Sequence, residues 1–123
     1  SAAITICKDL LNEGAELVIH DPQVKEKQIA LDLESNSFNK ESANKYKNSD
    51  GIWSMATNID DALINSDAIL VLTEWIGYSE INWKSAYIKM RSPAWVFDSR
   101  SIIDPKLVKD AGLNFWRVGD GLI

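Results

Sequence analysis

Polar residues that could bind a ligand follow three apolar runs of the sequence. They are Asp21 after the first run, Glu74 and Trp75 after the second, and Asp98 and Arg100 after the third. Residues that follow the strands of a parallel sheet meet at one edge, where such sheets bind ligands. Arg100 is the strongest candidate, because its guanidinium offers a planar fork of donors to a phosphate or a carboxylate.

Each of these residues also has a purely structural interpretation. An ion pair of Arg100 with Asp98 or Asp104 would tie the loop down without a ligand, and the residues alone favour neither interpretation. Asp21 precedes proline, as a helix cap often does, so capping is favoured over ligand contact. For Glu74 and Trp75, packing is favoured over binding, since five tryptophans in this chain indicate core or interface roles.

Other residue types predict no complete active site. Cys7 falls on the apolar face of a predicted helix and is expected to be an inert thiol, and His20 ends a strand. One cysteine and one histidine are too few for a zinc site or an iron–sulfur cluster. A lone cysteine also excludes an intrachain disulfide and favours a reducing compartment, so we expect a cytoplasmic protein. No glycine-rich phosphate loop opens a helix.

Apolar periodicity predicts alternating strands and helices that would position these residues. Helices are predicted over 3–11, 22–33, 58–64, 83–90 and 105–111, and strands over 17–20, 52–55, 68–73, 94–97 and 114–118. The polar stretch 34–51 is expected to be a surface loop or a weak helix. The order predicts an α/β fold with an open, mostly parallel, Rossmann-like sheet and helices on both faces. Because the series starts with a helix, we expect that the first strand is missing and that the chain is a piece of a longer protein.

Length and charge indicate a single domain and argue against some classes of binding partner. The 123 residues, 46% of them hydrophobic and 25% charged, correspond to one globular domain. Thirteen basic residues against eighteen acidic ones give a net charge of −5, without a basic cluster. This balance argues against nucleic-acid and anionic-membrane partners. No apolar run approaches the length of a membrane span.

An ordered set of short motifs carries a resemblance over essentially the whole chain. The most specific are Thr73-Glu74-Trp75, Lys89-Met90, Pro93-Ala94 and Phe97-Asp98-x-Arg100, preceded by Asn12-Glu13-Gly14-Ala15, by Ile19-His20-Asp21-Pro22-Gln23-Val24 and by Ser66-Asp67-Ala68-Ile69, and followed by Asp104 and Val118-Gly119. The chain resembles the C-terminal, UDP-binding domain of the UDP-glucose/GDP-mannose dehydrogenase family. The Asp-Pro-Gln-Val and Glu-Trp forms are more similar to members that oxidise UDP-glucose than to those that oxidise GDP-mannose or UDP-N-acetylmannosamine.

The resemblance implies an NAD-dependent oxidoreductase that converts UDP-glucose to UDP-glucuronate in two hydride transfers. It implies that NAD binds mainly to an N-terminal domain and that the catalytic cysteine precedes this domain, so Cys7 is not that nucleophile. The chain alone would be inactive and would work with the remainder of its polypeptide, in a homo-oligomer. Arg100 is the one residue that the resemblance assigns to substrate binding.

Two further expectations remain open. Ser99 stands where the family's Asp-Gly-Arg loop has glycine, and serine would be strained there if the position needs a positive φ. The alternative function is a noncatalytic interaction domain whose Trp75, Trp83, Trp95 and Trp116 fill a subunit interface.

Overall fold

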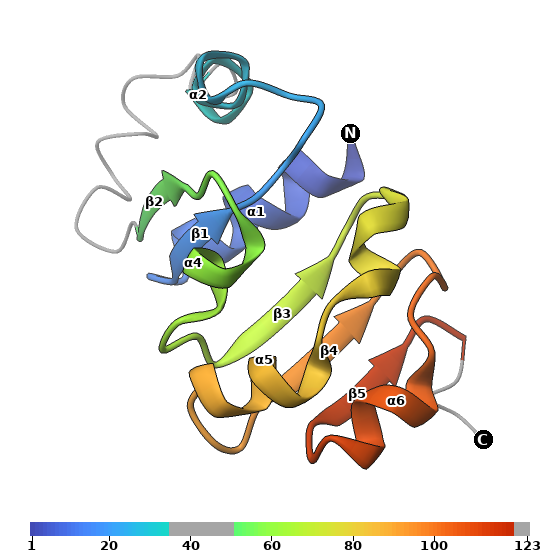
Figure 1. The fold of residues 1–123 in the computed structure, drawn as a ribbon. Coiled ribbons are helices and arrows are strands. Elements are labelled where there is room, and N and C mark those ends of the chain that lie inside the picture. Colours follow the sequence, from blue (N-terminus) through green and yellow to red (C-terminus); the bar gives the residue numbers. More distant parts are fainter. Residues whose placement is uncertain (35–50, 120–123) are drawn as a thin grey trace. The chain divides into compact units, whose positions relative to one another are not determined.

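The computed structural model describes residues 1–34 and 51–119, which fall into two compact units, Ser1–Asn58 and Ile59–Ile123 (Figure 1). Each unit has its own parallel sheet, of two strands in the first unit and three in the second. The loop expected over 34–51 lies, apart from its two end residues, outside the described residues.

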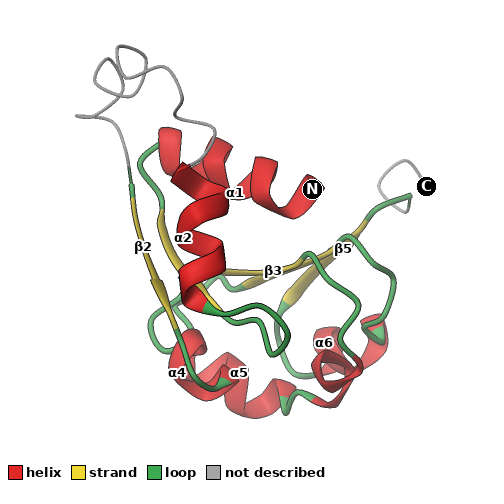
Figure 2. Ribbon diagram, turned by 90° about the horizontal axis from the view of Figure 1, so that it is seen from above, coloured by secondary structure: helices red, strands yellow, loops and turns green. Residues whose placement is uncertain are grey.

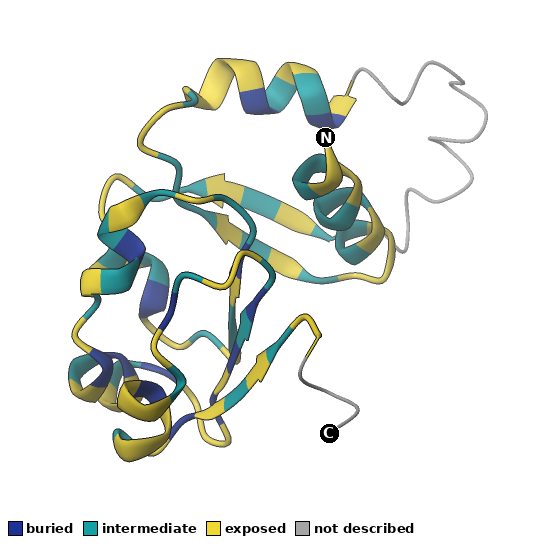
Figure 3. Ribbon diagram, turned by 90° about the vertical axis from the view of Figure 1, so that its right-hand side faces the viewer, coloured by how far each residue is buried: buried dark blue, intermediate teal, exposed yellow. Residues whose placement is uncertain are grey.

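The first unit contains α1 (Ala2–Asn12), β1 (Glu16–Ile19), α2 (Glu26–Glu34) and β2 (Ile52–Met55). Strands β1 and β2 pair in parallel, with Glu16 opposite Ile52 and Ile19 opposite Met55. Along both strands exposed residues alternate with partly buried ones, as Figure 3 shows. This period of two indicates a sheet with one covered face, and α1 packs against both β1 and α2.

The role expected for Asp21 is wrong in one respect, because this residue does not cap α2. Its Oδ1 accepts the backbone N–H groups of Gln23 and Val24, at 2.8 and 3.0 Å, and the helix begins only at Glu26. Asp21 thus forms a local turn through backbone groups two and three residues further on. Its carboxylate therefore stabilises the turn that precedes the helix.

The second unit is a three-stranded sheet with helices. Its elements are α4 (Ile59–Leu63), β3 (Ala68–Val71), the 3₁₀ helix η1 (Ile76–Glu80), α5 (Trp83–Lys89), β4 (Trp95–Asp98), α6 (Pro105–Asp110) and β5 (Asn114–Arg117). Strand β4 lies between β3 and β5, and all three are parallel. Figure 2 shows α4, α5 and α6 on the same side of this sheet. The predicted cap at Asp104 is confirmed, since its side chain accepts the N–H of Lys106.

The helix-covered face of the sheet holds the core of the second unit. Buried apolar side chains from β3, β4 and the helices form one cluster: Leu63, Val71, Tyr78, Trp83, Ala86, Met90, Ala94, Val96, Ile103, Val108 and Leu113. Trp83 is only 5% exposed within it. The expectation that Trp83 fills a subunit interface is therefore wrong, because its indole is already used inside the unit.

Aromatic rings line the other face of the same sheet. Trp95 stacks on Phe97 with ring centroids 5.5 Å apart, and Phe97 contacts Trp116 at 6.3 Å. Trp95 and Trp116 remain 38% and 41% exposed. These residues alternate along β4 and β5 with core residues, so the period-two pattern of the strands separates the two faces.

The predicted α/β class with open parallel sheets and helices is confirmed. The structure differs in dividing the strands between two sheets where one was expected, and in forming η1, which has no counterpart among the predicted elements. No helix within residues 1–34 and 51–119 combines the length and the apolar content needed to cross a membrane.

Candidate functional site at the carboxyl edge of the three-stranded sheet

The carboxyl ends of β3, β4 and β5 meet in register at Val71, Asp98 and Arg117. Glu74 and Arg100 lie just beyond two of these ends. Two of the three groups of candidate residues predicted from the sequence therefore lie at one edge of the same sheet, in the second unit. Asp21 belongs to the first unit and follows a strand of the other sheet.

Asp98 organises the loop that follows β4. Its carboxylate is fully buried and accepts four backbone hydrogen bonds, two at each oxygen. The N–H groups of Arg100 and Ser101 both lie 2.9 Å from Oδ1, and those of Ile102 and Ile103 lie 2.9 and 2.8 Å from Oδ2. A buried carboxylate needs such donors to replace its water, and the donors fix the backbone of the whole loop.

Ser99 attaches the same loop to the neighbouring strand. Its hydroxyl donates to the backbone carbonyl of Val71 at 2.7 Å, and its own N–H donates to that carbonyl at 3.1 Å. The left-handed residue of the loop is Ser101, with a φ of 59°, and Ser99 has no positive φ. The strain considered for serine at position 99 does not arise, and the hydroxyl adds a contact that glycine cannot make.

The guanidinium of Arg100 pairs with a carboxylate that the sequence did not single out as its partner. Nη2 of Arg100 donates to Oε1 of Glu74, 26 residues earlier in the chain. The expected pairing with Asp98 or Asp104 is wrong, because Asp98 binds the loop backbone and Asp104 caps α6. The paired side chains remain 44% and 61% exposed, so a ligand can reach them.

Trp75 packs within its own segment. Its indole meets Tyr78 edge-on at 5.0 Å, and a Cβ on Gly77 would lie only 2.3 Å from the ring, so this close approach requires glycine. The packing interpretation of Trp75 is confirmed.

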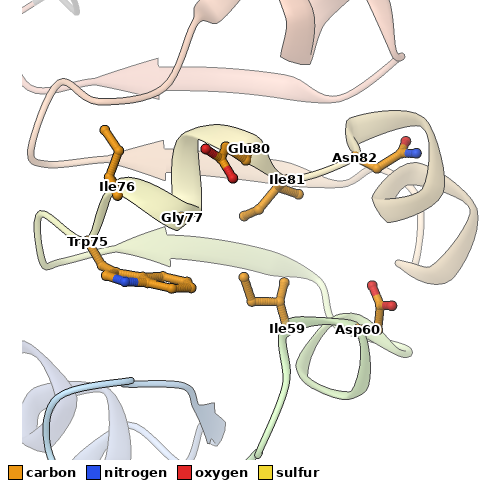
Figure 4. Close-up of a pocket in the computed structure, with 8 residues that line it drawn as sticks. All are labelled: Ile59, Asp60, Trp75, Ile76, Gly77, Glu80, Ile81 and Asn82. Atoms are coloured by element: carbon orange, nitrogen blue, oxygen red, sulfur yellow. The ribbon is translucent and has the colours of Figure 1, made fainter.

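A shallow hollow of about 400 Å³ lies beside Trp75, as Figure 4 shows. Apolar side chains of Trp75, Ile59 and Ile81 gather around it, with Asp60 and Glu80 also among its lining residues. Asp60 pairs with Lys89 at 3.0 Å. Of the two carboxylates in the lining, Asp60 therefore already has a cation, and the apolar side chains of Trp75, Ile59 and Ile81 pack against the core.

The remaining candidates give no sign of catalytic chemistry. Cys7 is partly buried in α1, and burial raises the pKa of its thiol, so the reactive thiolate is disfavoured. No group of three or more potential metal ligands occurs in the described parts of the chain. Sequence reasoning singled out Arg100, whose contact with a substrate stays a prediction. It missed the tethering hydroxyl of Ser99 and the pairing of Glu74 with Arg100.

Together the fold and the site define an α/β domain with an exposed arginine at the carboxyl edge of a parallel sheet. Residues 1–105 match the UDP binding domain of the UDP-glucose/GDP-mannose dehydrogenase family. The chain belongs to this family.

Curated relatives agree with this assignment. The chain is 36% identical to UDP-glucose 6-dehydrogenase of Drosophila melanogaster, 33% to UDP-glucose 6-dehydrogenase 3 of Arabidopsis thaliana and 30% to UDP-glucose 6-dehydrogenase 3 of Oryza sativa subsp. japonica. These alignments cover 97%, 98% and 98% of the chain, respectively. The chain spans only about a quarter of each relative's length, with 24%, 26% and 26% covered.

Proposed function

We propose that the chain is the nucleotide-sugar-binding domain of an NAD-dependent oxidoreductase that oxidises UDP-glucose to UDP-glucuronate. Family membership and the UDP-glucose 6-dehydrogenases among the relatives support this proposal. The observation that carries it is an accessible arginine on a loop whose backbone is already fixed by the chain itself. We further propose that the full polypeptide is a cytoplasmic homo-oligomer and that the chain is inactive without the rest of it.

In this proposal the residues of the chain bind and orient the substrate and take no part in the chemical steps. The Arg100 guanidinium binds an acceptor group of UDP-glucose through charge-assisted hydrogen bonds. Asp98 and Ser99 hold the loop so that the guanidinium projects from a fixed backbone. Binding of this kind adds substrate affinity and positions the sugar for groups supplied elsewhere in the polypeptide.

The described residues do not fit an NAD site of the usual dinucleotide-binding kind. None of the strands β1 to β4 is followed by a glycine-rich turn that opens a helix, and that turn is where the pyrophosphate of the dinucleotide binds. We therefore propose that NAD binds to the remainder of the polypeptide.

Removing the guanidinium tests the substrate contact. In the full polypeptide, Arg100→Ala is expected to raise KM for UDP-glucose between about tenfold and about 150-fold, the range for a lost hydrogen bond to a charged group. The value of kcat should change little, because the interaction is made equally in the ground state and the transition state. Steady-state kinetics with UDP-glucose measures both constants.

Arg91→Ala is the matched control for this variant. Arg91 is an exposed arginine that precedes β4, and so lies at the opposite edge of the same sheet, paired with Asp67 at 3.5 Å. Its removal should leave KM unchanged. An unaltered KM in Arg100→Ala would contradict the substrate role of Arg100.

The identity of the nucleotide sugar requires its own experiment. The family includes enzymes of both UDP-glucose and GDP-mannose, as its name states. We expect the full polypeptide to oxidise UDP-glucose with a higher kcat/KM than GDP-mannose or UDP-N-acetylmannosamine. A preference for either of the other two would reassign the substrate while leaving the family unchanged.

A further inference from the structure

The Arg100–Glu74 pair joins two neighbouring strand ends. Glu74 follows β3 and Arg100 follows β4, which pairs with β3 from Ala68 to Val71. Among the described residues, Glu74 is the side chain that contacts the Arg100 guanidinium. Both side chains are partly open to solvent, at 44% for Arg100 and 61% for Glu74.

The loop backbone is built without Glu74. Asp98 accepts the N–H groups of residues 100–103, and Ser99 binds the carbonyl of Val71. What these contacts leave free is the Arg100 side chain, which has many rotamers and loses that freedom when it binds a ligand. An exposed guanidinium without a partner would therefore bind a ligand only after this ordering.

Glu74 restricts that freedom while leaving donors available. The contact uses one nitrogen, Nη2, and a guanidinium carries five N–H donors. An acceptor group of a ligand can bind the remaining donors while Glu74 stays in place.

We propose that Glu74 is a positioning residue for Arg100, holding the guanidinium at the carboxyl edge of the sheet before the nucleotide sugar arrives. This inference rests on the proposed function, in which Arg100 contacts the substrate. The alternative role of Glu74 is to compete with the substrate for Arg100. The two roles predict opposite changes in KM for UDP-glucose. If Glu74 positions Arg100, then removing its carboxylate weakens substrate binding. If Glu74 competes, the same change strengthens it.

A double-mutant cycle in the full polypeptide tests the proposal. Glu74→Ala is expected to raise KM for UDP-glucose about twofold to fivefold, the change that an exposed ion pair supports, with kcat within about twofold of the parent. Glu74→Asp, which keeps the charge, should restore part of the affinity. In an Arg100→Ala background, Glu74→Ala should change KM no further, because the residue acts through Arg100.

Asp67→Ala is the control for loss of an exposed carboxylate paired with an arginine. It breaks the pair with Arg91 and should leave KM unaltered. A lowered or unchanged KM in Glu74→Ala, with KM raised in Arg100→Ala, overturns the positioning role alone. An effect of Glu74→Ala that persists without Arg100 overturns it too, by showing that Glu74 acts independently. An unchanged KM in Arg100→Ala instead defeats the proposed substrate contact, and the positioning role with it.

Discussion

Asp98 is the buried charged residue of the described structure, and each of its oxygens accepts two backbone N–H groups. A substitution that keeps its shape and removes its charge separates packing from hydrogen bonding. After Asp98→Asn, the amide nitrogen would face two N–H donors, which cannot bond to it. The loop that presents Arg100 therefore depends on the charge of one side chain.

We expect Asp98→Asn to destabilise the loop by about 3 kcal/mol, because buried donors and a charge-assisted acceptor lose their partners. Hydrogen exchange of the amides of residues 100–103 should become about 150-fold faster in the full polypeptide. Asp104→Asn is the control, since this exposed cap accepts one N–H and asparagine caps helices equally well. Unaltered exchange in Asp98→Asn would show that the loop is held by other contacts.

Arg100 could be singled out from the sequence, whereas its partner could not. The rule that ligand sites follow parallel strands placed Glu74 and Arg100 near one edge, but the nearest carboxylates in sequence are Asp98 and Asp104. Both of these are used by backbone groups, one in the loop and one at the start of α6. Only the three-dimensional arrangement shows which carboxylate remains for the guanidinium.

At the scale of elements, strong apolar periodicity predicted the regular structure within one or two residues, as for α1 and β2. The exception is α2, whose predicted start at Pro22 precedes the observed start at Glu26. The helix η1 was missed, because its five residues are too short for a periodic pattern and the side chain at its cap position, Trp75, does not cap the helix. The division into two sheets was also missed, since strand pairing depends on contacts between distant parts of the chain.

The end of α6 provides a prediction at this scale. Gly112 has a φ of 103°, and a Cβ there would approach Cε1 of Tyr87 to 3.0 Å. Gly112→Ala is expected to destabilise the second unit by about 1 to 3 kcal/mol, through backbone strain and this contact. The free energy of unfolding from urea titration measures the loss.

Gly119→Ala separates the two causes. Gly119 has a similar φ of 95°, but its Cβ would meet nothing within 4 Å. This variant should carry the backbone strain alone and lose less stability than Gly112→Ala. Equal losses would show that the Tyr87 ring moves aside at no cost.

At the scale of the whole molecule, the apolar cluster lies entirely in the second unit, while the buried apolar residues described in the first are Ile29 and Leu33. Val96 is a fully buried member of that cluster. Val96→Ala is expected to destabilise the second unit by about 2 kcal/mol through lost burial and a residual cavity. Hydrogen exchange of β3, β4 and β5 should accelerate accordingly.

Val118→Ala is the control for this substitution, because Val118 is 55% exposed. It should change exchange in the three strands very little. Equal acceleration by both variants would contradict the view that stability resides in the cluster between the sheet and its helices.

The amides bound by Asp98 have a consequence for the chemistry of anions at this edge. Successive backbone N–H groups that converge on one point form the concave donor array with which many proteins hold phosphate. Here the chain's own carboxylate fills that array as a tethered ligand, present at an effective concentration that a free anion does not reach. A phosphate group therefore finds no vacant backbone nest in this loop. An anion at this edge would have to be bound by a side chain, such as the planar guanidinium of Arg100.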